Sequence, residues 1–226
     1  PALYFGMGTS EPKIREFLTY AGIQISIGEI SKLLIKEQDP FHAEKNAVYE
    51  AGLRSSPWQH IDDTATRVAG QNEHCHVVCN PVYTVYQTTP HKDRLSVLDV
   101  LRNGRPRCFR LNAAALAYLE NVPLSKATRQ SLQAECSDTE LDEPAFQQSL
   151  ARLLPNLGEH QRKAITDAAA IAAYHADPLW PIVEMLVCDD APQFVGVTDA
   201  LTLCWVHAGR PYKKLLPVIP LQDRKS

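Results

Sequence analysis

The sequence predicts an α/β fold, with a core built on a mixed β-sheet, an all-helical insertion in that core, and a small helical domain before it. Three observations predict this fold. Helical periodicity fills about the first fifty residues, a period of two begins at Trp58, and helical signals alone occupy about residues 105–176 before the apolar run 182–188. We therefore expect a helical, helix-turn-helix-like domain over residues 1–52 and a core over residues 53–226.

The length and composition fit a globular protein with one core and an appendage. The 226 residues are 45% hydrophobic and 22% charged, which excludes collagen-like, low-complexity and wholly disordered chains. The net charge of −3 does not indicate a nucleic-acid partner, so any such partner must bind a local basic patch. Apolar runs all fall short of the roughly 18 residues that a membrane span needs, so no membrane partner is expected.

Three helices are expected in the first domain. Residues 10–22 begin with a capping serine and end with glycine, and Ser26 and Glu29 have the spacing of a capping box that opens a second helix. A third helix is expected to start at Asp39 and to end before Gly52. The second helix could read DNA in a helix-turn-helix, but its exposed charges are mixed, so a packing or dimerising role is at least as well supported.

Extended segments follow at about residues 58–69, 74–80 and 82–88, separated by turn residues, and they predict a three-stranded meander. A helix should follow Pro90 and stop at Asn103-Gly104, because glycine is common just beyond a helix C-terminus.

Two pairs of aspartates could carry chemistry. Asp189 and Asp190 directly follow the buried apolar run, and ligands of open α/β sheets bind beyond the carboxyl ends of parallel strands. Asp62 and Asp63 lie within the first extended segment, where neighbouring side chains point to opposite faces. Each pair can therefore give one carboxylate to a shared site.

Carboxylates from two neighbouring strands are hard oxygen ligands of the kind that Mg²⁺ or Mn²⁺ prefers. Two such ions about 3.5 to 4 Å apart can promote an in-line displacement at a phosphodiester. The alternative interpretation is that both acidic pairs mark strand ends or turns, and spacing alone does not exclude it.

The cysteines and histidines of the meander are of the residue types that bind zinc. On an extended segment His74 and His76 share one face while Cys75 and Cys79 share the other, so the four cannot converge on one ion. The six cysteines are scattered along the chain, which favours reduced thiols and a reducing compartment over a disulfide framework.

Several segments, in order along the chain, resemble one family. They are WQHIDDTATRVAGQN (58–72), CNPVYTVYQTTPHKDRLSVLDVL (79–101), IAAYH (171–175), LVCDDAPQF (186–194) and LCWVHAGRPYKKL (203–215). Together they resemble the DDE-type transposases of bacterial insertion sequences, and most closely the insertion-sequence-sixty-six-like group. The resemblance implies an RNase H-like core with an Asp on its first strand, a second Asp after its fourth strand, and a Glu on a later helix.

Carried over by motif, the resemblance implies catalytic and metal-binding roles for Asp62 and Asp189, with Asp63 and Asp190 as further candidate ligands. It implies two Mg²⁺ or Mn²⁺ ions, and metal-dependent cleavage and strand transfer of DNA at transposon ends. The partners it implies are double-stranded DNA, both transposon ends and target, and a second copy of the chain in a homodimer on DNA. It further implies a bacterial cytoplasmic location, associated with the nucleoid.

The third acid of the family has no counterpart in the sequence. No glutamate follows Glu184, and the only acids beyond Asp190 are Asp199, which we expect to cap or begin a helix, and Asp223 near the end. We therefore expect a transposase core truncated before its third acidic residue. The alternative is a catalytically inactive, transposase-derived protein that binds DNA or acts in assembly.

Basic residues follow the second acid closely. If residues 203–215 are helical, His207, Arg210 and Lys214 share one side, and Lys213 lies beside them. These four residues are candidate contacts to the DNA backbone, and a solvated helix face is an equally supported alternative.

Overall fold

The computed structural model describes residues 2–36, 38–213 and 215. The chain divides into two compact units, Pro1–Val48 and Tyr49–Ser226. This division falls inside the third helix, a few residues before the boundary expected after residue 52.

The first unit holds short helices. They are the π-helix η1 (Ala2–Gly6), α1 (Glu11–Tyr20), α2 (Ile27–Ile35) and the first part of α3 (Asp39–Arg54). The predicted capping box is confirmed, because the Glu29 amide donates to Ser26 Oγ at 3.1 Å and the Ser26 amide donates to the Glu29 carboxylate at 2.8 Å.

The third helix does not end before Gly52, as the sequence suggested, but continues to Arg54. Gly52 is buried, and a Cβ atom placed there would lie 2.5 Å from a ring carbon of Tyr83. Glycine at this position therefore serves close packing of the helix on a strand and does not mark a helix end.

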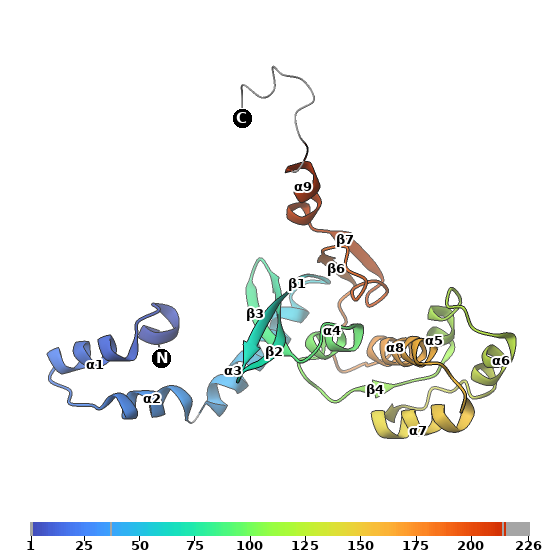
Figure 1. Cartoon of the computed structure of the whole chain (residues 1–226), viewed down its shortest axis with the longest axis horizontal. Coiled ribbons are helices and arrows are strands. Elements are labelled where there is room, and N and C mark those ends of the chain that lie inside the picture. The colour runs from blue at the N-terminus through green and yellow to red at the C-terminus, as the bar shows by residue number, and fades with distance from the viewer. Residues whose placement is uncertain (1, 37, 214, 216–226) are drawn as a thin grey trace, which may run out of the picture. The chain divides into compact units, whose positions relative to one another are not determined.

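A five-stranded mixed sheet forms the centre of the second unit (Figure 1). Its strands are β1 (Trp58–Val68), β2 (Gln71–Asn80), β3 (Tyr83–Thr89), β6 (Met185–Cys188) and β7 (Ala200–Leu203), in the order β3-β2-β1-β6-β7. The predicted meander is confirmed, since β1 to β3 pair antiparallel in sequence order. The other two pairs, β1 with β6 and β6 with β7, are parallel.

The residues after Asp199 form a strand, which corrects the expectation of a helix there. Ala200 to Leu203 pair in parallel with Met185 to Cys188, and the Ala200 amide donates to the Glu184 carbonyl at 3.0 Å. Tertiary pairing with the buried strand β6 outweighs the local signal for a helix cap.

The segment between β3 and β6 is mainly helical. It contains α4 (Arg94–Leu101), β4 (Cys108–Phe109), α5 (Ala113–Tyr118), α6 (Lys126–Ala134), β5 (Leu141–Asp142), α7 (Glu143–Leu153) and α8 (Glu159–His175). The all-helical insertion expected at 105–176 is therefore wrong in one respect, because β4 and β5 pair as a two-stranded sheet. Phe109 of β4 is fully buried and stacks on Phe146, with ring centroids 4.8 Å apart, so burial of this ring fixes an extended backbone.

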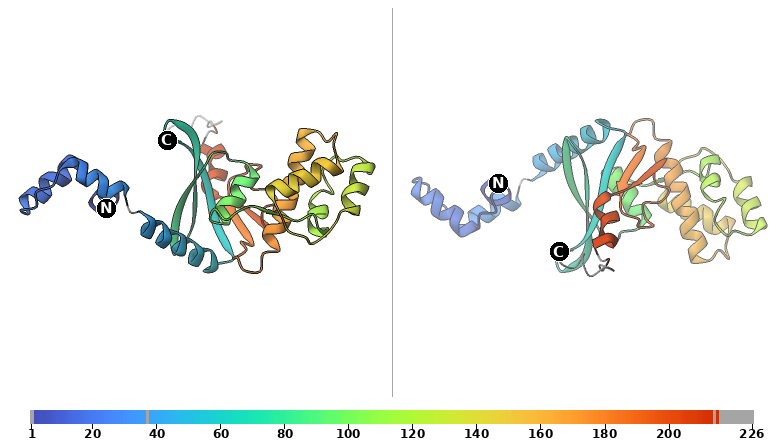
Figure 2. Two further views of the ribbon diagram at one scale, coloured as in Figure 1. Left: turned by 90° about the horizontal axis from the view of Figure 1, so that it is seen from below. Right: turned by 90° about the horizontal axis from the view of Figure 1, so that it is seen from above.

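The hydrophobic core lies on one face of the five-stranded sheet. Ile61 and Val85 of the sheet belong to the same buried cluster as Leu101 of α4 and Ile165 of α8, and Figure 2 shows α8 and the helices of the insertion together on that side. Asp62, next to Ile61 on β1, is exposed, so β1 has a covered face and an open face. Among the described residues, no helix is long and apolar enough to cross a membrane.

Candidate metal centre

The register between β1 and β6 places the two predicted acids side by side. The strands are parallel, and His60 pairs with Val187. Continuing this register by two residues puts Asp62 next to Asp189, which directly follows β6. Because paired residues of parallel strands point to the same face, both carboxylates lie over the open face at the carboxyl end of the sheet.

A third residue reaches the same place from β7. This strand ends at Leu203, and α9 (Trp205–Lys213) starts two residues later at the same edge of the sheet. His207 lies in the first turns of α9, and its Nε2 is 3.9 Å from Oδ2 of Asp62. Pro211 lies inside this helix, which continues past it to Lys213.

Asp62, Asp189 and His207 form a cluster in which one ligand atom from each residue lies within 4.8 Å of the others. Asp62 is exposed, while Asp189 and His207 are partly buried. Each carboxylate has one oxygen engaged by a backbone amide, from Asp63 to Asp62 at 2.9 Å and from Ala191 to Asp189 at 3.1 Å. These amide contacts orient the carboxylates and leave the second oxygen of each available for a ligand.

Asp63 does not join this cluster, although it was a candidate ligand. Its side chain points to the covered face, where it accepts a hydrogen bond from Gln193 Nε2 at 2.9 Å and lies 3.5 Å from Lys92 Nζ. Gln193 belongs to the loop that follows Asp189, so this bond ties the strand that carries one acid to the loop that carries the other.

A hollow of about 290 Å³ opens beside the cluster. Two carboxylates, an imidazole, a guanidinium and apolar side chains line it. The lining residues are Asp189, Asp190, Leu203, His207, Ala208, Arg210 and Pro211. Arg210 and Lys213 are exposed on α9, and Lys214 lies outside the described residues. A phosphate group in this hollow would lie near both the acids and a guanidinium.

Cys188, the last residue of β6, points away from the cluster and is buried. Burial, together with the nearby negative charges of Asp189 and Asp62, raises the pKa of its thiol to about 12. The thiol therefore stays protonated at neutral pH, and its position on the covered face keeps it away from the cluster.

His76 occupies the covered face of the sheet, opposite Asp63 in the β1–β2 register. Its side chain is fully buried, and Nε2 lies 2.8 Å from the Thr89 hydroxyl, which donates to the His91 carbonyl. Because that hydroxyl gives its proton to the carbonyl, Nε2 must carry the ring proton. Burial lowers the pKa of His76, so the ring is neutral and serves the structure of the sheet.

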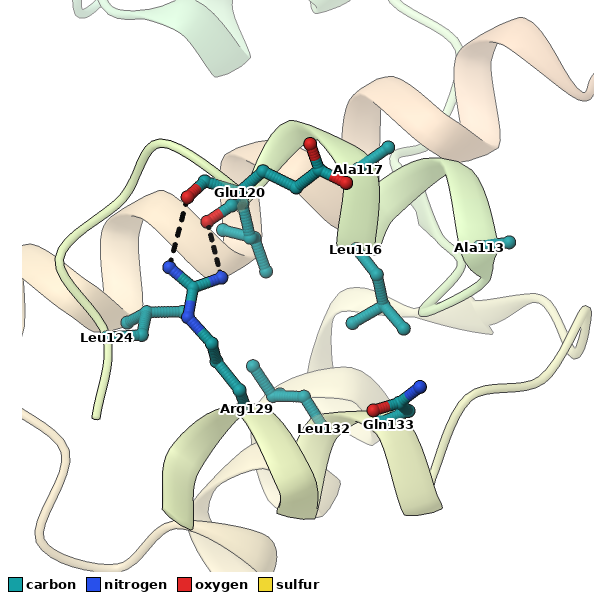
Figure 3. Close-up of a pocket in the computed structure, with 9 residues that line it drawn as sticks. Ala113, Leu116, Ala117, Glu120, Leu124, Arg129, Leu132 and Gln133 are labelled. Atoms are coloured by element: carbon teal, nitrogen blue, oxygen red, sulfur yellow. Dashed lines mark hydrogen bonds between the residues drawn. The ribbon is translucent and has the colours of Figure 1, made fainter. Parts of the chain in front are cut away.

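The helical insertion carries a separate pocket between α5 and α6 (Figure 3). Leu116, Leu124 and Leu132 contribute to its apolar wall. The guanidinium of Arg129 donates to the backbone carbonyls of Leu119, Glu120 and Val122 and so closes the end of α5. The guanidinium of Arg129 is therefore used for structure.

The structure thus brings Asp62 and Asp189 together, as the sequence suggested, and adds His207 at the carboxylates. The sequence suggests for His207 either a contact to the DNA backbone or a place on a solvated helix face. A prediction of the strand at Ala200–Leu203 would have placed His207 at the site. A helix that begins just after a parallel strand has its first turn where that strand ends, beside the ends of its parallel neighbours.

The chain is similar to a curated protein of a bacterium. The chain is 32% identical over 177 residues to the uncharacterized protein y4jO of Sinorhizobium fredii (strain NBRC 101917 / NGR234). The match covers 77% of this chain and 54% of y4jO, so the chain spans about half the length of this relative. No family model and no solved structure matches the chain.

Proposed function

We propose that this chain forms the RNase H-like core of a DDE-type DNA transposase, which cleaves and transfers DNA strands with divalent metal held by Asp62 and Asp189. The observation that carries the proposal is that these two acids, 127 residues apart in sequence, lie side by side over the open face of a mixed sheet, where β6 ends.

The order of the elements supports the RNase H-like assignment. In the family that the sequence resembles, the first Asp lies on the first strand and the second Asp follows the fourth. Asp62 lies on β1, and Asp189 follows β6, which is the fourth strand of the five-stranded sheet in chain order. The mainly helical insertion precedes that fourth strand.

The donor set suits the expected metal. Asp62 and Asp189 would hold Mg²⁺ or Mn²⁺, two ions by the resemblance, because hard divalent cations prefer carboxylate oxygen. When bound, such ions make an attacking oxygen more nucleophilic and stabilise the leaving oxygen of a phosphodiester. The partly exposed position of the cluster leaves room for a DNA strand to approach it.

Side chains of α9 are placed to hold the DNA backbone. Arg210 lines the hollow beside Asp189, and Lys213 is exposed one turn further along the helix. Charge-assisted hydrogen bonds from a guanidinium to a phosphate would fix the position of the strand over the acids. Double-stranded DNA and a second copy of the chain remain the proposed partners.

The alternative is a catalytically inactive transposase-derived protein that binds DNA or acts in assembly. The last glutamate of the sequence is Glu184, which precedes β6 and both acids of the second pair. The chain therefore supplies two of the three carboxylates that the resembling family uses.

The test compares single acids of the site with an exposed aspartate outside it. Asp62→Asn and Asp189→Asn should each abolish Mn²⁺ binding in calorimetry and lower Mn²⁺-dependent nicking of plasmid DNA by about 1,000-fold or more, whereas Asp199→Asn should retain both. Nicking is measured with this chain and with the product of its whole gene.

The outcomes separate the two functions. Metal binding and nicking that both depend on Asp62 and Asp189 support the transposase core. Metal binding without nicking by the whole-gene product supports the inactive alternative. Nicking that survives both substitutions would contradict the assignment of the site.

A further inference from the structure

We infer that His207 is a third protein ligand of the divalent ion held by Asp62 and Asp189, and that the site consequently favours Mn²⁺ over Mg²⁺. This inference rests on the proposed metal site and names its ligand set. It gives His207 a role at the metal in place of the DNA contact that the sequence suggested.

The distances fit one ion among three side chains. Nε2 of His207 lies 3.9 Å from Asp62 Oδ2, and all three ligand atoms lie within 4.8 Å of one another. With bonds of about 2.1 Å, adjacent ligands of an octahedral ion are about 3 Å apart and opposite ligands about 4.2 Å apart. A side-chain movement of less than about 1 Å would therefore bring the three atoms to bonding distance.

The environment of His207 leaves its ring nitrogens open. The contact between Nε2 and Asp62 is too long for a hydrogen bond. Within the described part of the chain, Nδ1 is buried and has no hydrogen-bond partner. The side chain is only 18% exposed, so water has limited access to the ring. Nε2 can therefore bind a metal, and the ring proton would then be on Nδ1.

The backbone holds His207 in place. β6 and β7 pair through Cys188 and Leu203, and the Cys204 amide donates to the Cys188 carbonyl at 2.7 Å. The Ala208 amide then donates to the Cys204 carbonyl at 2.9 Å, which starts the helix beside Asp189. Asp62 within β1, Asp189 just after β6 and His207 in the first turn of the helix that follows β7 form a nearly preorganised site.

The chemistry of the donor set gives the metal preference. Imidazole binds transition-metal ions better than Mg²⁺, which prefers oxygen ligands and retains its water. A set of two carboxylates and one imidazole should therefore bind Mn²⁺ more tightly than Mg²⁺, and this preference should depend on the imidazole. Mn²⁺ is also the suitable probe because the free cysteines of the chain would bind Zn²⁺ or Co²⁺ elsewhere.

The experiment measures nitrogen coordination directly. Pulsed electron paramagnetic resonance of bound Mn²⁺ should show ¹⁴N modulation from a coordinated imidazole, and labelling histidine with ¹⁵N should change that modulation in the wild-type chain. His207→Ala should remove it. His60→Ala is the matched control, because His60 lies on the same face of β1 two residues from Asp62 and outside the cluster.

Calorimetry measures the affinity of the same variants for Mn²⁺ and Mg²⁺. His207→Ala should weaken Mn²⁺ binding by about 10- to 100-fold and Mg²⁺ binding by much less, which reduces the preference for Mn²⁺. His60→Ala should leave both affinities within about twofold of wild type.

The inference is overturned if bound Mn²⁺ shows no imidazole modulation in the wild type, or if His207→Ala keeps the wild-type affinity while Asp62→Asn loses binding. In that second case the proposed metal site stands without the histidine. If the wild-type chain binds neither ion, the proposed metal site fails, and the inference about His207 fails with it.

Discussion

The two faces of β1 use adjacent aspartates for different purposes. Asp62, on the open face, has a side chain that is 57% exposed and lies beside Asp189 and His207. Asp63, on the covered face, has a side chain that is 8% exposed and is held by Lys92 and Gln193. The same residue type is therefore a candidate ligand on one face and a structural group on the other.

The difference teaches how a buried polar group and a functional one can be told apart. On the covered face the carboxylate of Asp63 and Nε2 of His76 have protein partners, which offset the cost of burying these polar atoms. On the open face, the exposed carboxylate of Asp62 is open to water. A buried carboxylate beside a cation and an amide donor indicates a structural role for Asp63, whereas exposure beside a second acid and a histidine makes Asp62 a candidate ligand.

The largest expected effect is on the free energy of unfolding, compared between variants at two neighbouring positions of β1. Ile61→Ala should lower the free energy of unfolding by about 2 to 5 kcal/mol, because Ile61 is 2% exposed in the core and the substitution leaves a cavity. Asp62→Ala should change it by less than about 0.5 kcal/mol, since surface substitutions cost little. Urea unfolding followed by circular dichroism measures both, and equal losses in the two variants would mean that both faces are covered.

The next effect concerns pH and the covered face. Burial lowers the pKa of His76 in the folded protein, so below about pH 6.5 the unfolded chain binds a proton that the folded chain does not. The contribution of His76 to stability is therefore present above about pH 6.5 and lost as the pH falls, by at most about 1.4 kcal/mol per pH unit.

Three charged or titratable groups influence this histidine, namely His74, Asp63 and Lys92, of which Asp63 favours protonation. His76→Gln should flatten the dependence of stability on pH between about 5 and 6.5 relative to wild type. Unfolding curves at several pH values measure the slope. An unchanged slope in the variant would show that His76 is already protonated in the folded protein or is not the responsible group.

The smallest expected effect tests the bond between β1 and the loop after Asp189. A double-mutant cycle of Asp63→Ala and Gln193→Ala should give a coupling energy of about 1 kcal/mol, because the two side chains share a hydrogen bond to a charged group. The matched cycle of Asp62→Ala and Gln193→Ala should give coupling below about 0.5 kcal/mol. Coupling with Asp62 that equals the coupling with Asp63 would remove the distinction between the two faces.

Local sequence signals predicted the elements that are stabilised by interactions between residues close in sequence. The capping box of Ser26 and Glu29, the meander from β1 to β3 and the helix after Pro90 depend on residues close in sequence, and the structure contains all three. Errors occurred where distant contacts decided the outcome. Gly52 lies within a helix because it packs on Tyr83, and the residues after Asp199 extend because β6 offers them a parallel partner.

The sequence by itself determined which residues could carry the chemistry. Alternation along β1 separates Asp62 from Asp63, and the apolar run of β6 places Asp189 at a strand end. Only the tertiary structure decided that these acids meet each other and His207, because the acids meet through pairing of β1 with β6, two segments more than a hundred residues apart, and the start of α9 depends on pairing of β6 with β7. Such pairing is fixed by burial of the shared core, a property of the whole fold that a local pattern of residues does not specify.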